Sequence, residues 1–539
     1  MSLTEKIGQL FVVPIGRHSP NALRLPPDQR TGAALAHDSL GQVVDQIRRH
    51  HVGGVCYFPT RPEGDEAGDV AALLGELTAA TDAATVRPVL SVDQEGGTVA
   101  RLRRGVTSVP GAMALAATGD PANAERIGQV IGTELRAVGF HQDYAPDADV
   151  NSNPANPVIG LRSFGSDPEA VSRYVVAALR GLRGAGLAAT VKHFPGHGDT
   201  ATDSHLELPA VSRDRASWEA VDLAPFAAAI GAGVDAVMSA HVAVPAADPS
   251  GAPATASSAI LTGVLRDQLG FRGVAVTDAM DMAGARTHGD GEAVVRALAA
   301  GADQLLMPAD LEVAVAAVRD AVESGRVPHA RLDEAVGRIL TLKHRLGLLP
   351  GTTPPPPPDA VDAAGHAALA LDLAHRAVTV LGKPDWRPPA GGRIALVGYL
   401  DGVQDALLPA LSRDGAEVTA VDSGSNPCAT TLVAPLQAAA EADLTVVVTR
   451  SAMRWEGQRS LLAALGAAGR PHVLLALKEP YDAGLAPDAL SRILTYGDNE
   501  VLRAALVDVL TGAARGGGRL PVDVPGPDGR TAYRRGEGG

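Results

Sequence analysis

The sequence predicts an α/β protein with a (β/α)8 TIM-type barrel over residues 1–350 and a smaller three-layer α/β/α domain over residues 360–530. Three observations lead to this prediction. Eight short apolar runs of strand type alternate with helical patterns in the first part of the chain, as eight βα units would. A second alternating pattern follows near the C-terminus. Between them lie five consecutive prolines, Pro354 to Pro358, and because polyproline joins neither a helix nor an inner strand, residues 351–359 are predicted to be a linker.

The predicted barrel strands are the apolar runs of the first segment. They lie at 10–15, 52–58, 88–92, 139–144, 189–193, 236–241, 273–277 and 304–307. An open doubly wound sheet could use the same runs, because strand order cannot be read from a sequence, but the number of units favours the barrel. In a barrel, catalytic groups are expected where the strands end and the loops begin.

The second segment is predicted to begin with an Ala-rich helix over 360–380. Its expected strands lie at 394–397, 418–421, 444–449, 473–477 and 493–496, in a parallel sheet. It carries no glycine-rich nucleotide motif, so no cofactor is predicted. The last ten residues are expected to be a frayed tail. A cluster of Arg454, Trp455 and Glu456 either borders a substrate cleft or forms a surface loop.

Composition excludes several classes of protein. The chain of 539 residues is 46% hydrophobic and 20% charged, which excludes wholesale disorder. A net charge of −14 without a long basic run argues against nucleic-acid and anionic-membrane partners. Cys56 and Cys428 are expected to be buried thiols in a reducing compartment. The N-terminus does not resemble a signal peptide and no apolar run is long enough to span a membrane, so a cytoplasmic location is predicted.

Charged and imidazole side chains follow five consecutive predicted barrel strands, which solubility alone does not explain. In chain order they are Asp93, Glu95, Arg101, Asp147, Asp149, Lys192, His193, His197, Asp199, His241, Asp278 and Asp281. Asp278 follows a short apolar run, so its carboxylate is expected at a rigid, partly desolvated strand end, where it could attack a carbon centre or stabilise positive charge. The alternative is a surface aspartate that caps the next helix.

The loop after the fifth strand contains Asp203 and His205. A carboxylate two residues from an imidazole can fix its tautomer, so that the histidine can donate and later accept a proton. A metal centre is the competing interpretation, because His193, His197 and Asp199 lie in the same stretch as this pair. Against a metal, the prolines and glycines place the stretch in a loop, without a helical histidine pair.

These residues resemble glycoside hydrolase family 3, in particular its bacterial β-N-acetylglucosaminidases. The resemblance rests on KHFPGHGDT at 192–200, DSH at 203–205, DQEGG at 93–97, YAPDADVN at 144–151, RSFG at 162–165 and FRGVAVTDAM at 271–280. It spans strands three to seven of the predicted barrel, and the presence of a second α/β domain is similar to some members of this branch.

The resemblance implies a retaining hydrolase that removes terminal GlcNAc, with peptidoglycan-derived saccharides as substrates. Asp278 would be the nucleophile, and His205 the acid/base with Asp203 as its partner. Five further residues would contact the sugar: Asp93, Arg101, Arg162, Lys192 and His193. No metal and no cofactor are implied.

Three alternatives stay open at this point. A neutral imidazole repels an incoming anion less than a carboxylate does, so phosphate could replace water and the enzyme could be a phosphorylase. A β-glucosidase-type activity would mean a different branch of the family. A non-catalytic sugar-binding protein is disfavoured because every position of the resemblance is intact. The sequence indicates neither the oligomeric state nor the role of the second domain.

Overall fold

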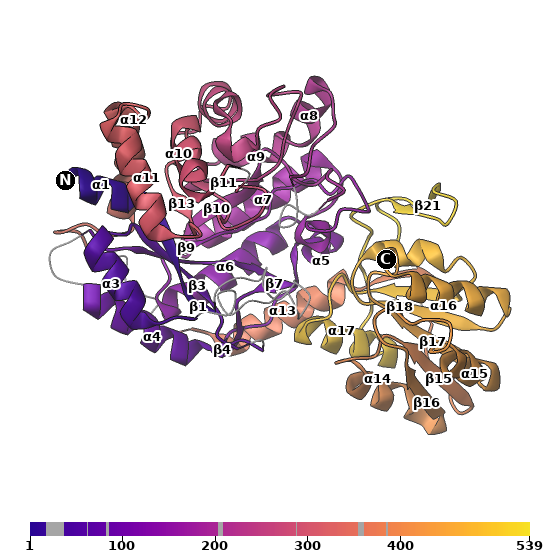
Figure 1. Cartoon of the computed structure of the whole chain (residues 1–539). Helices are drawn as coiled ribbons and strands as arrows, with labels where there is room; N and C mark the ends of the chain where they lie inside the picture. The colour runs from indigo at the N-terminus through magenta and orange to yellow at the C-terminus, as the bar shows by residue number, and fades with distance from the viewer. Residues whose placement is uncertain are drawn as a thin grey trace.

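The chain folds into two α/β bodies, which Figure 1 shows side by side in a computed structural model. The structure describes residues 1–17, 37–61, 63–81, 86–202, 208–286, 288–353, 361–383 and 386–539. Two predictions fall on the remaining residues: the Asp203–His205 pair and most of the linker at 351–359.

The first body is an eight-stranded parallel barrel, as predicted. Its strands, in spatial order, are β12 (Val274–Thr277), β11 (Ala236–Ser239), β10 (Ala188–Phe194), β9 (Gln142–Asp143), β5 (Val89–Val92), β3 (Gly54–Phe58), β1 (Phe11–Arg17) and β13 (Leu305–Leu306). A parallel bridge between Val276 and Gln304 brings the two ends of this order together. The open-sheet alternative is therefore wrong.

Helices surround the barrel (Figure 1). They are α1 (Leu3–Gln9), α3 (Leu40–His50), α4 (Ala67–Thr81), α5 (Ala112–Ala117), α6 (Ala122–Val138), α7 (Pro168–Gly184), α8 (Arg215–Val221), α9 (Ala224–Gly231), the π-helix η5 (Ala259–Gln268), α10 (Asp290–Ala300), α11 (Leu311–Glu323) and α12 (His329–Arg345). Local sequence sets their ends: in α7, Asp167 caps the Ala170 amide and Pro168 occupies the first turn. At the end of α6, Gly139 takes the left-handed conformation (φ 111°) that glycine adopts readily.

Short strands and 3-10 segments lie in the loops of the barrel. They are β2 (His37–Asp38), β4 (Asp65–Glu66), β6 (Gln94–Gly96), β7 (Val99–Ala100), β8 (Leu102–Arg104), η3 (Gly160–Arg162) and η4 (Ala254–Ala256). The antiparallel pair β6–β7 directly follows β5 and brings Arg101 back toward Asp93.

The second body is a six-stranded sheet with order β14 (Thr379–Gly382), β19 (Ser491–Leu494), β18 (His472–Ala476), β17 (Leu444–Thr449), β15 (Arg393–Gly398) and β16 (Glu417–Asp422). Its helices and short segments are α13 (Ala363–Ala377), α14 (Gln404–Leu411), η6 (Arg413–Gly415), α15 (Val433–Glu441), α16 (Glu456–Ala467), η7 (Pro480–Leu485) and α17 (Glu500–Thr511). The five predicted strands are present. These five strands pair parallel, as predicted. A sixth strand that was not predicted, β14, pairs antiparallel with β19 at the edge, so the helix predicted over 360–380 ends earlier, at Ala377.

Two further predictions are wrong. The last residues are ordered against their surroundings: β20 (Val524–Pro525) pairs with β21 (Thr531–Tyr533), and Arg535 forms an ion pair with Asp167 of the barrel at 2.7 Å. Hydrogen bonding and charge pairing thus hold a segment whose composition alone suggested fraying. Cys428 is exposed, because it lies in a surface turn before α15, whereas Cys56 is buried in β3 as predicted.

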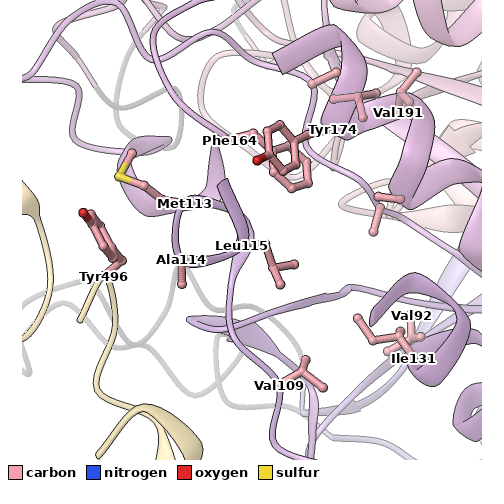
Figure 2. Packing of buried hydrophobic residues seen from close by; sticks show 14 of the residues in the cluster. Val92, Val109, Met113, Ala114, Leu115, Ile131, Phe164, Tyr174, Val191 and Tyr496 are labelled. Atoms are coloured by element: carbon pink, nitrogen blue, oxygen red, sulfur yellow. The ribbon is translucent and has the colours of Figure 1, made fainter. Parts of the chain in front are cut away.

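The two bodies share buried apolar contacts. Figure 2 shows Tyr496 extending from the second body toward α5, which carries Met113 and Ala114. A hydrogen bond from Asn499 Nδ2 to the Val109 carbonyl (2.8 Å) lies in the same region. The exact domain boundary at 351–359 stays a prediction.

Candidate active site

A cavity of about 250 Å³ opens at the carboxyl ends of the barrel strands. The carboxyl ends of β5, β10 and β12 bring Asp93, Lys192 and Asp278 to it, although these residues are far apart in the sequence. All of the predicted site residues that the structure describes line this cavity: Asp93, Arg101, Arg162, Lys192, His193 and Asp278.

Lys192 stands at the centre of a buried ionic network. Its Nζ lies 2.8 Å from Asp93 Oδ1 and 2.6 Å from Glu95 Oε1, and its side chain is only 3% exposed. Burial alone would lower the pKa of Lys192, but the two carboxylates raise it above its ordinary value. Burial raises the pKa values of Asp93 and Glu95. The neighbouring cations, Lys192 among them, have the larger effect and hold both pKa values below the ordinary range. The network is therefore fully ionised near neutral pH.

Arg162 binds Glu95 through both arms of its guanidinium, with Nε–Oε2 at 2.9 Å and Nη2–Oε1 at 2.7 Å. This bidentate geometry fixes the planar guanidinium. Arg101 lies near the same network, 3.4 Å from Asp93 Oδ2, and its guanidinium carbon lies 5.2 Å from the centre of the Phe58 ring. The cavity thus presents fixed cations and anions to a ligand.

The tautomer of His193 follows from its partners. Arg162 Nη2 lies 3.1 Å from His193 Nε2, and a guanidinium can only donate, so Nε2 accepts. Nδ1 therefore carries the hydrogen and donates it to Asp149 Oδ2 at 2.8 Å. Burial, and secondly the charge of Arg162, lower the pKa of His193 to about 4, so the ring is neutral at pH 7.

Two buried aspartates support this histidine. Asp149 also accepts from the main-chain amide of His197 at 2.6 Å, so it orients the start of the loop after β10. Asp147 Oδ1 accepts from the Asp149 amide at 2.9 Å. Burial and the adjacent Asp149 charge raise the pKa of Asp147 above its ordinary value.

Two of the residues that the metal-site interpretation named are held by other protein groups. His197 Nδ1 is hydrogen-bonded to Thr200 Oγ1 at 2.7 Å, and Asp199 is held by Arg213 at 2.9 Å. His193 does cluster with Asp147 and Asp149 closely enough for a cation. However, Arg162 lies against this cluster, 3.8 Å from Asp147 Oδ2, and its positive charge opposes a cation there.

Asp278 is half-buried at the end of β12. Its amide donates to the Ser239 carbonyl at 2.9 Å, and its Oδ1 accepts from the Ala279 amide at 2.8 Å. Residues 280–285 form turns and a bend, and the next helix, α10, begins only at Asp290, so the helix-cap interpretation is wrong. The carboxylate instead lines the cavity.

Sequence reasoning gave no role to three residues that the geometry places in the site. Glu95 bridges two cations, Asp149 orients His193, and Phe58 packs under Arg101. The signal for Glu95 was its place two residues after Asp93, which put it at the same strand end. Asp203 and His205 lie outside the described residues, so their roles stay predictions.

The fold and site define a two-domain barrel enzyme with a small, strongly polar cavity. A model of the glycosyl hydrolase family 3 N-terminal domain matches residues 2–342, and the chain belongs to this family. A β-N-acetylglucosaminidase/β-glucosidase from Cellulomonas fimi is 32% identical, over 97% of this chain and 94% of the relative.

Solved structures give the same picture for the whole chain. A family 3 β-N-acetylglucosaminidase from Paenibacillus sp. str. FPU-7 is 34% identical with a TM-score of 0.84, and the match covers 97% of this chain and 99% of that one. A β-glucoside phosphorylase is 26% identical with a TM-score of 0.80, over 97% and 94% of the two chains. Both domains are therefore part of the resemblance.

Proposed function

We propose that this chain is an exo-acting retaining β-N-acetylglucosaminidase that hydrolyses terminal GlcNAc from saccharides. The observation that carries the proposal is the meeting of Asp278 with the Asp93–Lys192–Glu95–Arg162 network around one cavity. Its volume of about 250 Å³ lies below the ~300–1,000 Å³ usual for pockets of drug-sized ligands, which suits a single sugar unit. The family and the named relatives support the reaction class.

In the proposed mechanism, Asp278 attacks the anomeric carbon as nucleophile and forms a glycosyl-enzyme, which water resolves with net retention. The main-chain amide of Ala279 donates to Oδ1 of Asp278 and so orients the carboxylate. His205 would protonate the leaving oxygen and then take a proton from water, with Asp203 fixing its tautomer. These two roles rest on the sequence resemblance.

The sugar contacts are proposed for Asp93, Arg101, Arg162, Lys192 and His193. Charge-assisted hydrogen bonds to sugar hydroxyls can strengthen as the ring approaches an oxocarbenium ion. The existing ion pairs hold these groups in place before the sugar arrives, which reduces the reorganisation needed during the reaction.

Phosphate in place of water is the second candidate, and one observation favours it: a structural neighbour over both domains is a β-glucoside phosphorylase. A neutral histidine acid/base would admit an anion more readily than a carboxylate. The two candidates share the nucleophile and differ in the molecule, water or phosphate, that takes the sugar from the enzyme. They are therefore distinguished by measuring whether the rate depends on phosphate.

The natural substrates are proposed to be peptidoglycan-derived fragments, in a cytoplasmic recycling role. The resemblance supports this setting, and an acidic chain without a long basic run fits neither a nucleic-acid nor a membrane partner. Among the residues that the structure describes, no helix combines the length and apolarity needed to cross a bilayer.

The test is the initial rate of p-nitrophenol release from β-GlcNAc and β-glucose glycosides, with and without phosphate. Preference for β-GlcNAc that does not depend on phosphate, with β-GlcNAc as the first product by proton NMR, supports the hydrolase. Phosphate-dependent release of a sugar 1-phosphate supports the phosphorylase. Preference for glucose would contradict the proposed specificity.

A further inference from the structure

A segment at the edge of the cavity contains little regular structure of its own. Residues 151–162 carry Val158 and Arg162 into the cavity wall, and only η3 at their end is helical. Because Arg162 must meet Glu95 in a bidentate geometry, the path of this segment has to be held by contacts from outside it.

The second domain supplies one of these contacts through Arg454. Its Nη2 donates to the Asn156 carbonyl at 2.7 Å and its Nη1 donates to the Pro157 carbonyl at 3.1 Å. The guanidinium therefore spans two successive peptide units, a geometry that its planar fork allows and a lysine cannot reproduce. Glu479, which is 6% exposed, forms an ion pair with the same guanidinium, with its Oε1 2.6 Å from Arg454 Nη2.

Asn156, whose carbonyl accepts from Arg454, also forms several side-chain hydrogen bonds to the main chain around the site. Its side chain is buried and accepts from the amides of Val158 and Ile159 at 2.9 and 2.8 Å. Its Nδ2 donates to the His197 carbonyl at 2.8 Å. A displacement of Asn156 would thus reach both the cavity wall at Val158 and the loop after β10.

A second contact from the same domain holds the other end of the segment. Asn151 Nδ2 donates to Tyr481 Oη at 2.8 Å, and both side chains are buried. Tyr481 lies two residues after Glu479, so one short stretch of the second domain supports both contacts. The barrel segment is therefore pinned at two points by the second domain.

We infer that Arg454 is a positioning residue for the barrel site: it holds the 151–162 segment so that Arg162 and Val158 keep their places in the cavity. This gives the second domain a role in the reaction that needs no residue of that domain in the cavity. Of the predicted cluster of Arg454, Trp455 and Glu456, Arg454 is the member that acts, through the main chain of the barrel. The kinetic consequences rest on the proposed glycosidase function.

The kinetic test compares wild type with Arg454→Ala and Arg454→Lys on the β-GlcNAc glycoside. A misplaced binding group can cost on the order of 100-fold in rate, so we expect Arg454→Ala to lower kcat/KM by about 10- to 100-fold. KM should rise, because Arg162 is proposed to bind the sugar. Arg454→Lys should recover only part of the loss, because one ammonium cannot span two carbonyls.

The matched control is Arg535→Ala, which removes another arginine that crosses from the second domain to the barrel. Arg535 pairs with Asp167, the cap of α7, and not with the 151–162 segment. We expect its kcat and KM to stay within about 2-fold of wild type. Equal losses in both arginine variants would show a general effect of domain contact and would overturn the inference.

A second measurement does not depend on activity. In amide hydrogen exchange, Arg454→Ala should speed exchange at the Val158 and Ile159 amides, which Asn156 holds, while exchange in the β12 strand stays unchanged. If wild type lacks glycosidase activity, the proposed function fails and this exchange result still decides the positioning role. Unchanged exchange in 151–162 would overturn the inference, whatever the kinetics.

Discussion

Lys192 Nζ lies 2.6 Å from Glu95 Oε1, and the two side chains are only 3% and 5% exposed. The pair joins the carboxyl end of β10 to the antiparallel pair that follows β5. A buried ion pair of this kind adds little net stability, because desolvation offsets the attraction, but removing one partner leaves an uncompensated charge. The pair therefore fixes the geometry of the cavity, and we expect substitution of either residue to destabilise the protein.

Glu95→Gln should destabilise the protein and weaken sugar binding. The amide cannot neutralise Lys192 and Arg162, and breaking a buried pair costs about 3–5 kcal/mol; since Asp93 still pairs with Lys192, we expect about 3 kcal/mol. The midpoint of chemical unfolding and KM measure the two effects. The control is Glu169→Gln, whose carboxylate is 82% exposed and should contribute less than about 1 kcal/mol. Equal shifts for both variants would contradict the structural role of Glu95.

Asp278→Asn should abolish turnover while leaving the fold intact. An amide keeps the hydrogen bond from the Ala279 amide but is a far weaker nucleophile, so kcat should fall by about 10³-fold or more. Asp333→Asn, at an exposed position on α12, is the control and should keep wild-type rates. Wild-type kcat in Asp278→Asn would remove this residue from the mechanism.

His193 should make the protein less stable in acid. Its folded pKa of about 4 lies below the ordinary value of 6.5, so the unfolded chain binds the proton more tightly. The contribution of His193 to the free energy of unfolding is fully present above about pH 6.5, and about 3 kcal/mol of it is lost as the pH falls toward 4. Unfolding midpoints between pH 7 and 4 should fall less in His193→Gln than in wild type. Parallel curves for the two proteins would contradict this assignment.

Lys343 should make the protein more stable as the pH rises above 7. It is fully buried on α12, with Nζ 2.6 Å from Gln9 Oε1, and burial lowers its pKa to about 7. Below pH 7 its charge destabilises the fold, and this penalty disappears as the pH rises from about 7 to 10. The stability advantage of Lys343→Met over wild type should therefore shrink across this range. A constant difference would mean that Lys343 does not titrate there.

Gly198 should not tolerate a side chain. A Cβ at this position would lie 1.9 Å from the Val150 carbonyl oxygen, and neither main chain can move without shifting the site. Gly198→Ala should lower the unfolding temperature and reduce activity. Gly337→Ala, in the interior of α12 with open space around it, should instead stabilise by about 0.5–1 kcal/mol. A tolerated alanine at 198 would contradict the packing of this loop.

Much of the barrel could be predicted from local sequence. Apolar runs marked the positions of all eight strands, although β9 and β13 are only two residues long, and charged residues after the runs marked the site. The predictions failed where distant partners decide the structure. The helix predicted over 360–380 ends at Ala377, because pairing with β19 makes 379–382 a strand, and pairing with β20 orders the chain near Tyr533.

The sequence by itself determined the eight barrel strands, their order along the chain, and which of their ends carry Asp93, Lys192 and Asp278. Only the tertiary structure decided that Glu95 bridges Lys192 and Arg162, that His193 is neutral with its hydrogen on Nδ1, and that Arg454 reaches the main chain at Asn156. The physical reason is that secondary structure follows from the periodicity of neighbouring residues. Charge state and hydrogen-bond direction instead depend on burial and on partners that barrel closure and domain packing bring together.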